Sequence, residues 1–305
     1  MARAAKPGDR IAPAPGAKRQ ASSATRSSCA PGLYVVSTPI GNARDITLRA
    51  LDVLAAADVI ACEDTRVTRK LLTLYDITTP TLAYHEHNAE RVRPRLLQRL
   101  HDGEVVALVS DAGTPTISDP GYRLVHAART AALPVTAVPG ASAVLTALSV
   151  AALPTDRFMF VGFLPARSAA RRRALSALAT VEATLVCYEA ANRLAATLQD
   201  MAEQLGPRDA VIARELTKLH EEIRDGTLTE LAQHYGDAGP PRGEVVILVH
   251  GASGGADIPA MDLDAALRVA LAEHSLKQAV AQVTAQSGRP RREVYARALA
   301  LTGRG

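Results

Sequence analysis

The chain has 305 residues, enough for two domains of ordinary size, and 48% of them are hydrophobic while only 3% are aromatic. Because Trp is absent and aromatic residues are few, a surface that stacks many nucleobases is not expected. The three cysteines show no CxxC spacing, which argues against disulfides and a zinc site and suits a reducing compartment. No apolar run approaches the roughly 20 residues of a membrane span, so we expect a soluble, cytoplasmic protein that binds neither metal nor membrane.

Positive charge is distributed unevenly along the chain. The net charge is +4, and the basic excess of residues 1–31 is enough to account for it. This segment is rich in Ala, Pro, Gly and Ser and has no periodic apolar pattern, so we predict a disordered basic arm at 1–31. In the remainder, arginines gather after residue 166 and near the end of the chain. Solvated helix faces and nucleic-acid contacts explain such clusters equally well.

Strands and helices alternate in the first half of the chain. LYVVSTPIG, DVIAC, EVVALVS and PVTAV are short apolar runs with polar or Pro-Gly residues at their ends, which is typical of buried strands. Helical spacing of apolar residues follows Asp45, recurs in AERVRPRLLQRL and returns after Gly121 and Pro139. Such alternation predicts a mainly parallel sheet covered by helices on both faces. We therefore expect a first α/β domain at residues 32–153.

A second α/β domain is predicted at residues 154–251. Its strand candidates are FMFVGFLP, ATLVCYEA, DAVIARE and EVVILVHG, and helical segments such as ANRLAATLQDMAEQL lie between them. GASGGAD then reads as a flexible linker. Three helix-like segments follow, starting near Leu263, Ser275 and Arg289, and they predict a small helical tail at residues 260–305.

Three loops that follow predicted strands resemble one another: STPIGN, SDAGTPTISDPG and VPGAS. In an open parallel sheet, ligands bind beyond the carboxyl ends of the strands, where backbone N–H groups and helix N-termini converge. Gly41, Gly113 and Gly140 let the backbone approach a ligand closely, although many strand-to-helix turns contain glycine for steric reasons alone. The GxGxxG, GxxxxGK[ST] and HExxH motifs are absent. The pattern therefore predicts a ligand held mostly by backbone and small side chains.

Six sequence blocks in a fixed order carry a more specific signal. They read STPIGNARDITLRALDVLAAADVIACEDTRVTRKLL, SDAGTPTISDPG, VPGASA, FVGFLP, YEAANR and ARELTKLHEE. From about Leu33 to Leu301 the chain thereby resembles the bacterial ribosomal small-subunit RNA 2'-O-methyltransferase I family, a branch of the tetrapyrrole methylase superfamily. The resemblance implies two α/β domains with mainly parallel sheets and S-adenosylmethionine in the cleft between them. It also implies methyl transfer to the ribose 2'-hydroxyl of a cytidine in the decoding region of 16S rRNA, by a homodimer that acts on the small ribosomal subunit.

The same resemblance implies which residues meet the cofactor. Carried over motif by motif, they are Ile40, Asp111, Ala112, Gly113, Thr114, Ala141, Ser142, Glu189 and Arg214. They come from the loops that the strand pattern alone marks as ligand-binding, together with YEAANR and ARELT.

The chemistry adds two further sets of candidates. A ribose hydroxyl is a poor acid, so a side chain should accept its proton. The catalytic candidates are Glu63, Asp64, His87 and Lys218, with Asp119 of SDPG as a further carboxylate. The residues expected to contact RNA phosphates are Arg66, Arg171, Arg172, Arg193, Lys277, Arg291 and Arg292. For each candidate, a capping role or a structural ion pair is an equal alternative.

Two departures from the family pattern bear on function. YEAANR has Ala191 and Asn192 where the family usually has Pro and His, so position 192 is not expected to accept a proton. STPIGN has one glycine where the porphyrin branch usually has GxGxGD, which favours the RNA branch. Two alternatives stay open: a methylase of a tetrapyrrole or other small molecule, and a catalytically silent ribosome-binding relative.

Overall fold

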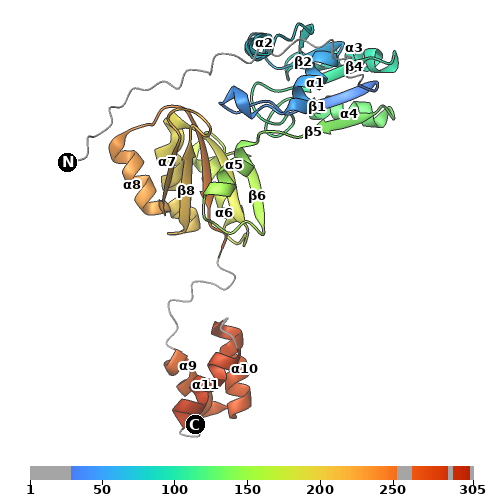
Figure 1. The fold of residues 1–305 in the computed structure, drawn as a ribbon. Coiled ribbons are helices and arrows are strands. Elements are labelled where there is room, and N and C mark those ends of the chain that lie inside the picture. The colour runs from blue at the N-terminus through green and yellow to red at the C-terminus, as the bar shows by residue number, and fades with distance from the viewer. Residues whose placement is uncertain (1–28, 253–262, 288–290, 303–305) are drawn as a thin grey trace, which may run out of the picture. The chain divides into compact units, whose positions relative to one another are not determined.

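The computed structural model describes residues 29–252, 263–287 and 291–302 (Figure 1). Contacts between residues divide the chain into two compact units. The first comprises Met1–Thr38 and Arg44–Gly140, and the second comprises Pro39–Ala43 and Ala141–Gly305. Of the predicted basic arm only residues 29–31 are described, and all of the predicted linker beyond residue 252 lies outside the described residues.

The first unit contains a five-stranded sheet in which every pairing is parallel, in the order β3-β2-β4-β1-β5. Its strands are β1 (Gly32–Val36), β2 (Val59–Cys62), β3 (Thr81–Ala83), β4 (Val105–Val109) and β5 (Val135–Val138). The helices that connect them are α1 (Leu48–Ala56), α2 (Thr65–Leu74), α3 (Ala89–His101) and α4 (Tyr122–Thr130). The predicted parallel sheet is confirmed, whereas α2 and β3 were not predicted.

Both faces of this sheet are buried because neighbouring side chains of a strand point to opposite sides. Val36, Ile60 and Ala107 pack on one face against α1 and α2. On the other face, Leu33, Ala61 and Leu108 pack against α3 and α4. All five residues of the central strand β4 are buried, which explains why EVVALVS reads as a continuous apolar run.

The second unit also contains a five-stranded sheet, in the order β6-β7-β10-β8-β9. Its strands are β6 (Phe158–Phe163), β7 (Thr184–Ala190), β8 (Asp209–Arg214), β9 (Glu222–Thr227) and β10 (Glu244–Val249). Only β6 and β7 pair in parallel, and the other three pairings are antiparallel. The expectation of a mainly parallel second sheet is therefore wrong. The unpredicted strand β9 has the sequence EIRDGT, which carries too little apolar character to read as a strand.

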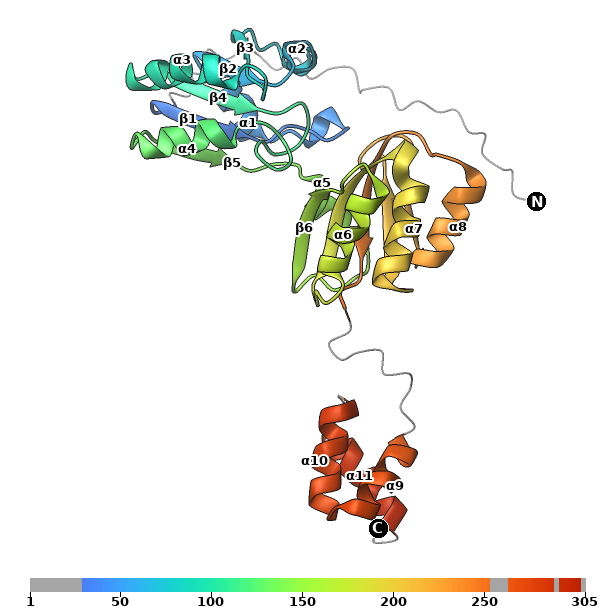
Figure 2. The ribbon, with the colours of Figure 1, turned by 180° about the vertical axis from the view of Figure 1, so that it is seen from behind.

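Helices cover both faces of the second sheet as well. They are α5 (Ala143–Val150), α6 (Ser168–Leu178), α7 (Leu194–Leu205) and α8 (Leu228–Ala238). Figure 2 shows α6, α7 and α8 side by side over one face. On the other face, Val144, Ala147 and Leu148 of α5 pack with Ile40 against β7, β8 and β10. Because α5 packs on this sheet, the division of the chain falls at Gly140 rather than at the predicted residue 153.

The C-terminal region consists of three described helices, α9 (Leu263–Glu273), α10 (Leu276–Ser287) and α11 (Arg291–Thr302). They match the three predicted helical segments. Leu267, Val280 and Val294, one from each helix, are fully buried in a shared small core. None of the helices in the described ranges is long and apolar enough to cross a membrane.

The burial of α3 on the first sheet gives a stability prediction. Leu96 is fully buried, so Leu96→Ala should lower the free energy of unfolding by about 2–5 kcal/mol, because it leaves a cavity as well as removing apolar contact. Leu74 of α2 is 67% exposed, and Leu74→Ala should change the same quantity by less than about 0.5 kcal/mol. Urea denaturation of both variants measures the difference. Equal losses would contradict the packing described for α3.

Candidate functional site

Two loops at the carboxyl edge of the first sheet are fastened to each other. Thr38 follows β1 and Gly113 follows β4, and each backbone N–H donates to the other residue's carbonyl, at 2.8 and 3.1 Å. The hydroxyls of Ser37 and Thr114 share a further hydrogen bond of 2.9 Å. Ser37 and Thr38 are both 3% exposed, so these bonds satisfy polar groups that water cannot reach. The loop that contains the predicted cofactor residues is therefore held in one arrangement.

Loops after β2 and β5 join the same edge. Asp111 accepts a 3.0 Å hydrogen bond from the backbone N–H of Asp64, which follows β2. Gly140 follows β5 and lies so close to the β1 loop that an added Cβ would be 2.9 Å from the Cβ of Ser37. The loops after four of the five strands thus meet, as expected for a parallel sheet. Asp111 and Ala112 remain exposed within this arrangement and are available to a ligand.

The loop between β4 and α4 also contains strained backbone. Thr116 and Ser118 have φ values of 76° and 62°, in the left-handed region that residues with a Cβ seldom adopt. Gly121, at φ 130°, ends the loop where α4 begins. Such strain persists only where the surrounding contacts impose it, and it concentrates at functional sites. The fastened segment around Gly113 supplies those contacts on one side of the strained turn.

The carboxylates at this edge have different protonation behaviour. Burial raises the pKa of Glu63, and the charges of Asp111, Asp119 and Asp64 raise it further. Burial also raises the pKa of Asp119, with a further contribution from Asp111, although a hydrogen bond from Ser110 opposes it. Asp64 differs, because hydrogen bonds from the Arg66 side chain and backbone lower its pKa to about 2. Glu63 is therefore the better proton acceptor of the two adjacent carboxylates.

His87, another catalytic candidate, lies in the exposed loop after β3, at the edge strand of the sheet. Its ring makes an edge-to-face contact with His85, with centroids 5.9 Å apart. The backbone N–H of His85 donates to the Asn88 side chain, which shapes this turn before α3. His87 thus shares the carboxyl edge of the sheet with Glu63 but belongs to a separate loop.

In the second unit, residues 39–43 contact the ARELTKLHEE segment. The backbone N–H of Asn42 donates to Thr217 Oγ1 at 3.1 Å. A Cβ added to Gly41 would be 2.5 Å from Lys218 Cγ, so only glycine fits against that side chain. Ile40 is 8% exposed and packs with Ala141, while Ser142 is the N-cap residue of α5. Three predicted cofactor residues therefore lie around one end of α5.

Lys218 forms ion pairs with two carboxylates. Its ammonium lies 2.7 Å from Glu215 and 2.8 Å from Glu244. Burial lowers the pKa of Lys218, but the hydrogen bonds to these carboxylates outweigh that effect and hold the pKa above its usual value. An ammonium that stays protonated cannot accept a proton, so this geometry argues against Lys218 as the catalytic base and for a role in holding the loop.

Glu189 and Arg214 face into the second unit. They flank Val245 of β10 in the sheet register. Glu189 is 3% exposed, and its two oxygens accept hydrogen bonds from Thr197 and from the backbone of Ala190. Arg214 donates twice to Glu222. Both side chains are committed to internal contacts, so their predicted contribution to cofactor binding would have to come from the backbone.

The comparisons with known proteins agree with this geometry. The family model for Tetrapyrrole (Corrin/Porphyrin) Methylases matches residues 32–232, and the model for the RsmI C-terminal HTH domain matches residues 257–302. The Ribosomal RNA small subunit methyltransferase I of Mesorhizobium japonicum is 50% identical over 272 residues, which cover 89% of this chain and 92% of that protein. The chain belongs to the ribosomal RNA small subunit methyltransferase I family, within the tetrapyrrole methylases.

Solved structures of other methyltransferases share the fold. The cobalamin biosynthetic enzyme cobalt precorrin-4 methyltransferase, CbiF, is 19% identical and has a TM-score of 0.55, over 72% of this chain and 94% of its own. A uroporphyrin-III C-methyltransferase from Thermus thermophilus, complexed with S-adenosyl homocysteine, is 22% identical with a TM-score of 0.50, over 71% of this chain and 96% of its own. At these identities the likeness concerns the fold alone.

The residues predicted to contact RNA differ in exposure and in ion pairing. Arg66 is exposed, although it pairs with Asp64. Arg172 is paired with Asp200 and Glu203, and Arg193 with Glu189. Lys277 and Arg292 are exposed on α10 and α11, and Arg291 begins α11. The two exposed residues of the helical region fit the prediction best.

The prediction that Arg171 contacts RNA is wrong. Its side chain is 5% exposed and lies 2.6 Å from Asp200, and it donates further hydrogen bonds to the carbonyls of Pro165, Ala166 and Ala196. A guanidinium buried among these acceptors cannot reach a phosphate without leaving a buried carboxylate unpaired. Arg171 therefore holds α6 to α7, and we remove it from the RNA-binding set.

Sequence reasoning missed Ser37 and Thr38, which fasten the two loops of the first unit. Both stand in the quoted STPIGN motif, directly after a buried strand, so their position was visible but their pairing with Thr114 and Gly113 was not. Small hydroxyl residues at the end of a buried parallel strand are the signal that could have marked them, because buried polar groups need partners.

Proposed function

We propose that the protein transfers the methyl group of S-adenosylmethionine to the 2'-hydroxyl of a cytidine ribose in the decoding region of 16S rRNA. The observation that carries the proposal is family membership, at 50% identity over 89% of the chain. The match of the C-terminal HTH model to residues 257–302 favours RNA over a small tetrapyrrole, because helix-turn-helix modules bind nucleic acid. The tetrapyrrole alternative draws on the family model that matches residues 32–232 and on fold likeness over 72% of the chain, and neither accounts for the C-terminal match.

The residues of the first unit fit the proposed cofactor. Exposed Asp111 offers a carboxylate to hydroxyl or ammonium groups, and exposed Ala112 presents backbone without a bulky side chain, whereas Gly113 is buried and bonded to Thr38. The close approach of Gly140 to Ser37 leaves no room for a larger residue there. When bound, S-adenosylmethionine supplies a methyl group already activated on a sulfonium, so no covalent enzyme intermediate is needed. The protein's main task is then to position the acceptor hydroxyl.

Glu63 is proposed to accept the ribose proton. Its carboxylate would take the proton that the ribose hydroxyl loses, while bound S-adenosylmethionine would supply the methyl group to the ribose oxygen. A raised pKa makes the ionised form of Glu63 a stronger base than an ordinary glutamate. Asp64, with its pKa of about 2 and its bonds to Arg66, is a much weaker base.

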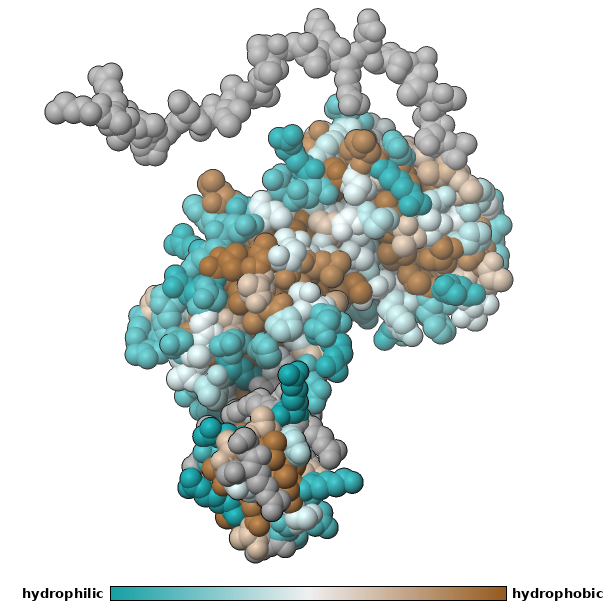
Figure 3. Space-filling view, turned by 60° about the horizontal axis from the view of Figure 1, so that its bottom comes forward, coloured by the Kyte–Doolittle hydropathy of each residue, from teal (hydrophilic) through white to brown (hydrophobic). Residues whose placement is uncertain are grey.

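The proposed partners are 16S rRNA within the small ribosomal subunit and a second copy of the chain. That substrate also gives the proposed location, the cytoplasm. A homodimer is supported by exposed apolar side chains on the second unit. Figure 3 shows apolar side chains gathered on the surface. The exposed residues are Leu145 and Val150 of α5 and Phe158, Met159 and Phe163 of β6. Strand β6 is also at the edge of its sheet, where apolar surface invites pairing.

Methylation of small ribosomal subunits tests the proposed function. The wild-type protein should transfer labelled methyl to 16S rRNA at one ribose, and that linkage should resist alkaline cleavage. Labelling of tetrapyrrole precursors without labelling of RNA would overturn the proposal.

The same assay tests Glu63 as the proton acceptor. Glu63→Gln should lower kcat by about 10²–10⁴-fold, because it removes the proton acceptor. In the wild type, kcat should fall as pH is lowered through the raised pKa of Glu63, and Glu63→Gln should lose this limb of the profile. A glutamine variant with wild-type kcat would exclude Glu63 as the acceptor.

Cofactor binding tests the role of Asp111. Asp111→Ala should raise the Kd for S-adenosylmethionine by about tenfold or more, because a hydrogen bond to a charged group contributes roughly 1.5–3 kcal/mol. Asp52→Ala, which removes an exposed carboxylate from α1, is the matched control and should leave the Kd unchanged. Isothermal titration calorimetry measures both. If the two variants bind equally well, Asp111 does not contact the cofactor.

The oligomeric state tests the apolar surface of β6. Phe163 is 59% exposed, and Phe163→Asp should shift the protein from dimer to monomer, because a charge at an apolar interface is costly to desolvate. Leu48 of α1 is 76% exposed, and Leu48→Asp should leave the dimer intact. Size-exclusion chromatography with light scattering reports both masses. A monomeric wild type would refute the proposed dimer.

A further inference from the structure

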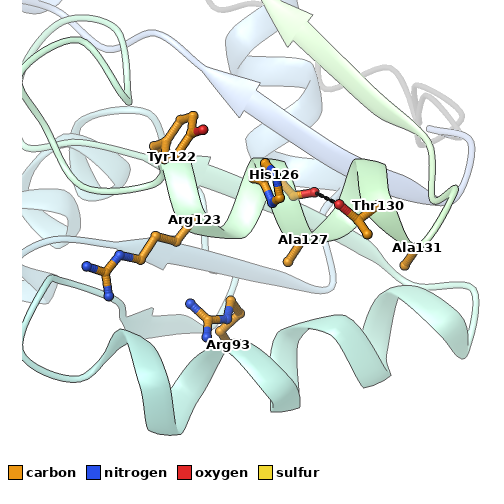
Figure 4. Close-up of a pocket in the computed structure, with 7 residues that line it drawn as sticks. All are labelled: Arg93, Tyr122, Arg123, His126, Ala127, Thr130 and Ala131. Carbon is orange, nitrogen blue, oxygen red and sulfur yellow. Dashed lines mark hydrogen bonds between the residues drawn. The ribbon is translucent and has the colours of Figure 1, made fainter.

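A basic groove lies between α3 and α4 of the first unit. Its volume is about 650 Å³, and it is lined by Arg93 of α3 and by Tyr122, Arg123, His126, Ala127, Thr130 and Ala131 of α4 and its end. Figure 4 shows Arg93 and Arg123 extending from the two helices toward the space between them. None of these residues belongs to the cofactor loops or to the basic clusters that the sequence pattern singled out.

The charge of these two helices is strongly one-sided. Four arginines of α3 and two of α4 stand against a single carboxylate, that of Glu90. Glu90 itself is 86% exposed and only 4.0 Å from Arg123, so it neutralises that guanidinium weakly. The remaining residues between 32 and 259 carry more Asp and Glu than Lys and Arg, so this basic excess is local.

The groove arginines differ in what they contact from the paired arginines of the second unit. Arg171, Arg172, Arg193 and Arg214 all pair with carboxylates of the second unit. Within the described residues, Arg93 makes no hydrogen bond or ion pair. The same holds for Arg91, Arg95 and Arg129, which are exposed on these two helices. Guanidinium groups left without a counter-charge are available to an external anion.

An aromatic side chain completes the groove. Tyr122 is 66% exposed, and its ring lies 6.0 Å from that of His126 in a tilted arrangement. A large aromatic residue exposed at the N-terminus of α4 offers a flat face on which a nucleobase can stack, beside cations that suit the phosphates. An acidic peptide would use the arginines but would have no need of the ring.

The groove begins at the candidate site. In a parallel sheet each helix starts where the preceding strand ends, so α3 and α4 both begin at the carboxyl edge that carries Glu63 and Asp111. Tyr122 follows directly on the loop that contains Asp111 and Asp119. From Tyr122 to Thr130 the helix extends about 12 Å away from that edge. A nucleic-acid strand lying in the groove would therefore lead to the site of methyl transfer.

We propose that the α3–α4 groove binds the single-stranded RNA backbone next to the methylated nucleotide, with Arg93 and Arg123 on phosphates and Tyr122 under a base. The inference rests on the proposed function for the identity of the RNA, and it adds a binding surface separate from the helical region. It assigns the groove a part in substrate affinity and none in the transfer of the methyl group.

Binding to protein-free 16S rRNA tests the groove, with the full chain and RNA from cells that lack the modification. Arg93→Ala combined with Arg123→Ala should raise the Kd by about tenfold and flatten the slope of log Kd against log salt by about 1.4–1.8, the loss of two phosphate contacts. The matched control is Arg49→Ala combined with Lys70→Ala. It removes two exposed cations from α1 and α2, on the opposite face of the same sheet, and should change neither quantity. Thermal unfolding checks that both double variants fold.

The tyrosine has its own readout. Tyr122→Leu should raise the Kd for the same RNA without changing the salt slope, and Tyr122→Phe should restore wild-type affinity, because stacking requires the ring and not the hydroxyl. In turnover assays the arginine double variant should raise KM for the subunit, leave kcat unchanged and leave the Kd for S-adenosylmethionine unchanged. A lowered kcat with unchanged RNA affinity would overturn the inference.

Three outcomes separate the inference from its rivals. Equal RNA affinity of the arginine double variant and the wild type refutes the groove as an RNA site. Weakened binding to the assembled subunit with unchanged binding to protein-free rRNA would assign the groove to an acidic ribosomal protein and refute the RNA proposal. If the wild type methylates no RNA, the proposed function fails, while the RNA-binding comparison still decides the groove.

Discussion

The two backbone hydrogen bonds between Thr38 and Gly113 are the constraint on which the first unit's site depends. Strand adjacency brings the loops after β1 and β4 to one edge, but it leaves their conformations free. The paired bonds remove that freedom, and the Ser37–Thr114 contact reinforces them. Because both loops are fixed, Asp111 is presented to solvent while it still accepts the backbone N–H of Asp64. These loops are already ordered before a ligand binds, so binding does not have to cover the entropy cost of ordering them.

Some arginines of this chain pair with carboxylates and stabilise the fold, whereas others are unpaired and can bind an external anion. The Arg171–Asp200 pair is buried, and Arg172 and Ser168 also bond to the same carboxylate. Burial raises the pKa of Asp200, but these hydrogen bonds outweigh it and hold the pKa below its usual value. The network fastens α6 to α7, so this arginine-rich stretch of sequence forms a helix contact. On α3 and α4, in contrast, Arg91, Arg93, Arg95 and Arg129 make no ion pair within the described residues, although Arg99 pairs with Glu104 and Arg123 lies 4.0 Å from Glu90.

The sequence allowed most of the fold to be predicted where strands are apolar and uninterrupted. EVVALVS and EVVILVHG are central strands buried on both faces, and each reads as a short, continuous apolar run. The strand β9 was missed because EIRDGT is an edge strand with alternating polar residues and a glycine, stabilised by its neighbour rather than by its own composition. Strand β9 pairs antiparallel with β8 as a hairpin requires, and β10 adds two more antiparallel pairings, with β7 and β8, that apolar strand patterns do not reveal. The helix α2 was missed because its short amphipathic pattern lies inside the CEDTRVTRK motif.

The candidate site was predictable as a set of loops but not as a set of contacts. The motifs located Asp111, Glu63 and Lys218, yet which charges meet is a tertiary property that spacing does not encode. Lys218 was a plausible base from sequence, and only the approach of Glu244 from another strand shows that its ammonium stays protonated. The same limit hid the α3–α4 groove, whose arginines look like the solvated face of an ordinary helix until the two helices are placed side by side.

Ionising Glu63 and Asp119 in the folded state costs free energy, and this cost indicates a functional role. Burial and neighbouring charges raise the pKa of Glu63 and of Asp119. For a group whose folded pKa is raised, the contribution to stability is present below its ordinary value, 4.5 for Glu63 and 3.8 for Asp119, and is lost as pH rises through the raised value. Above the raised pKa values, the fold therefore keeps both groups ionised against a free-energy penalty. Clusters of this kind persist where function requires a base with a tuned pKa, which agrees with Glu63 as the group that receives the ribose proton.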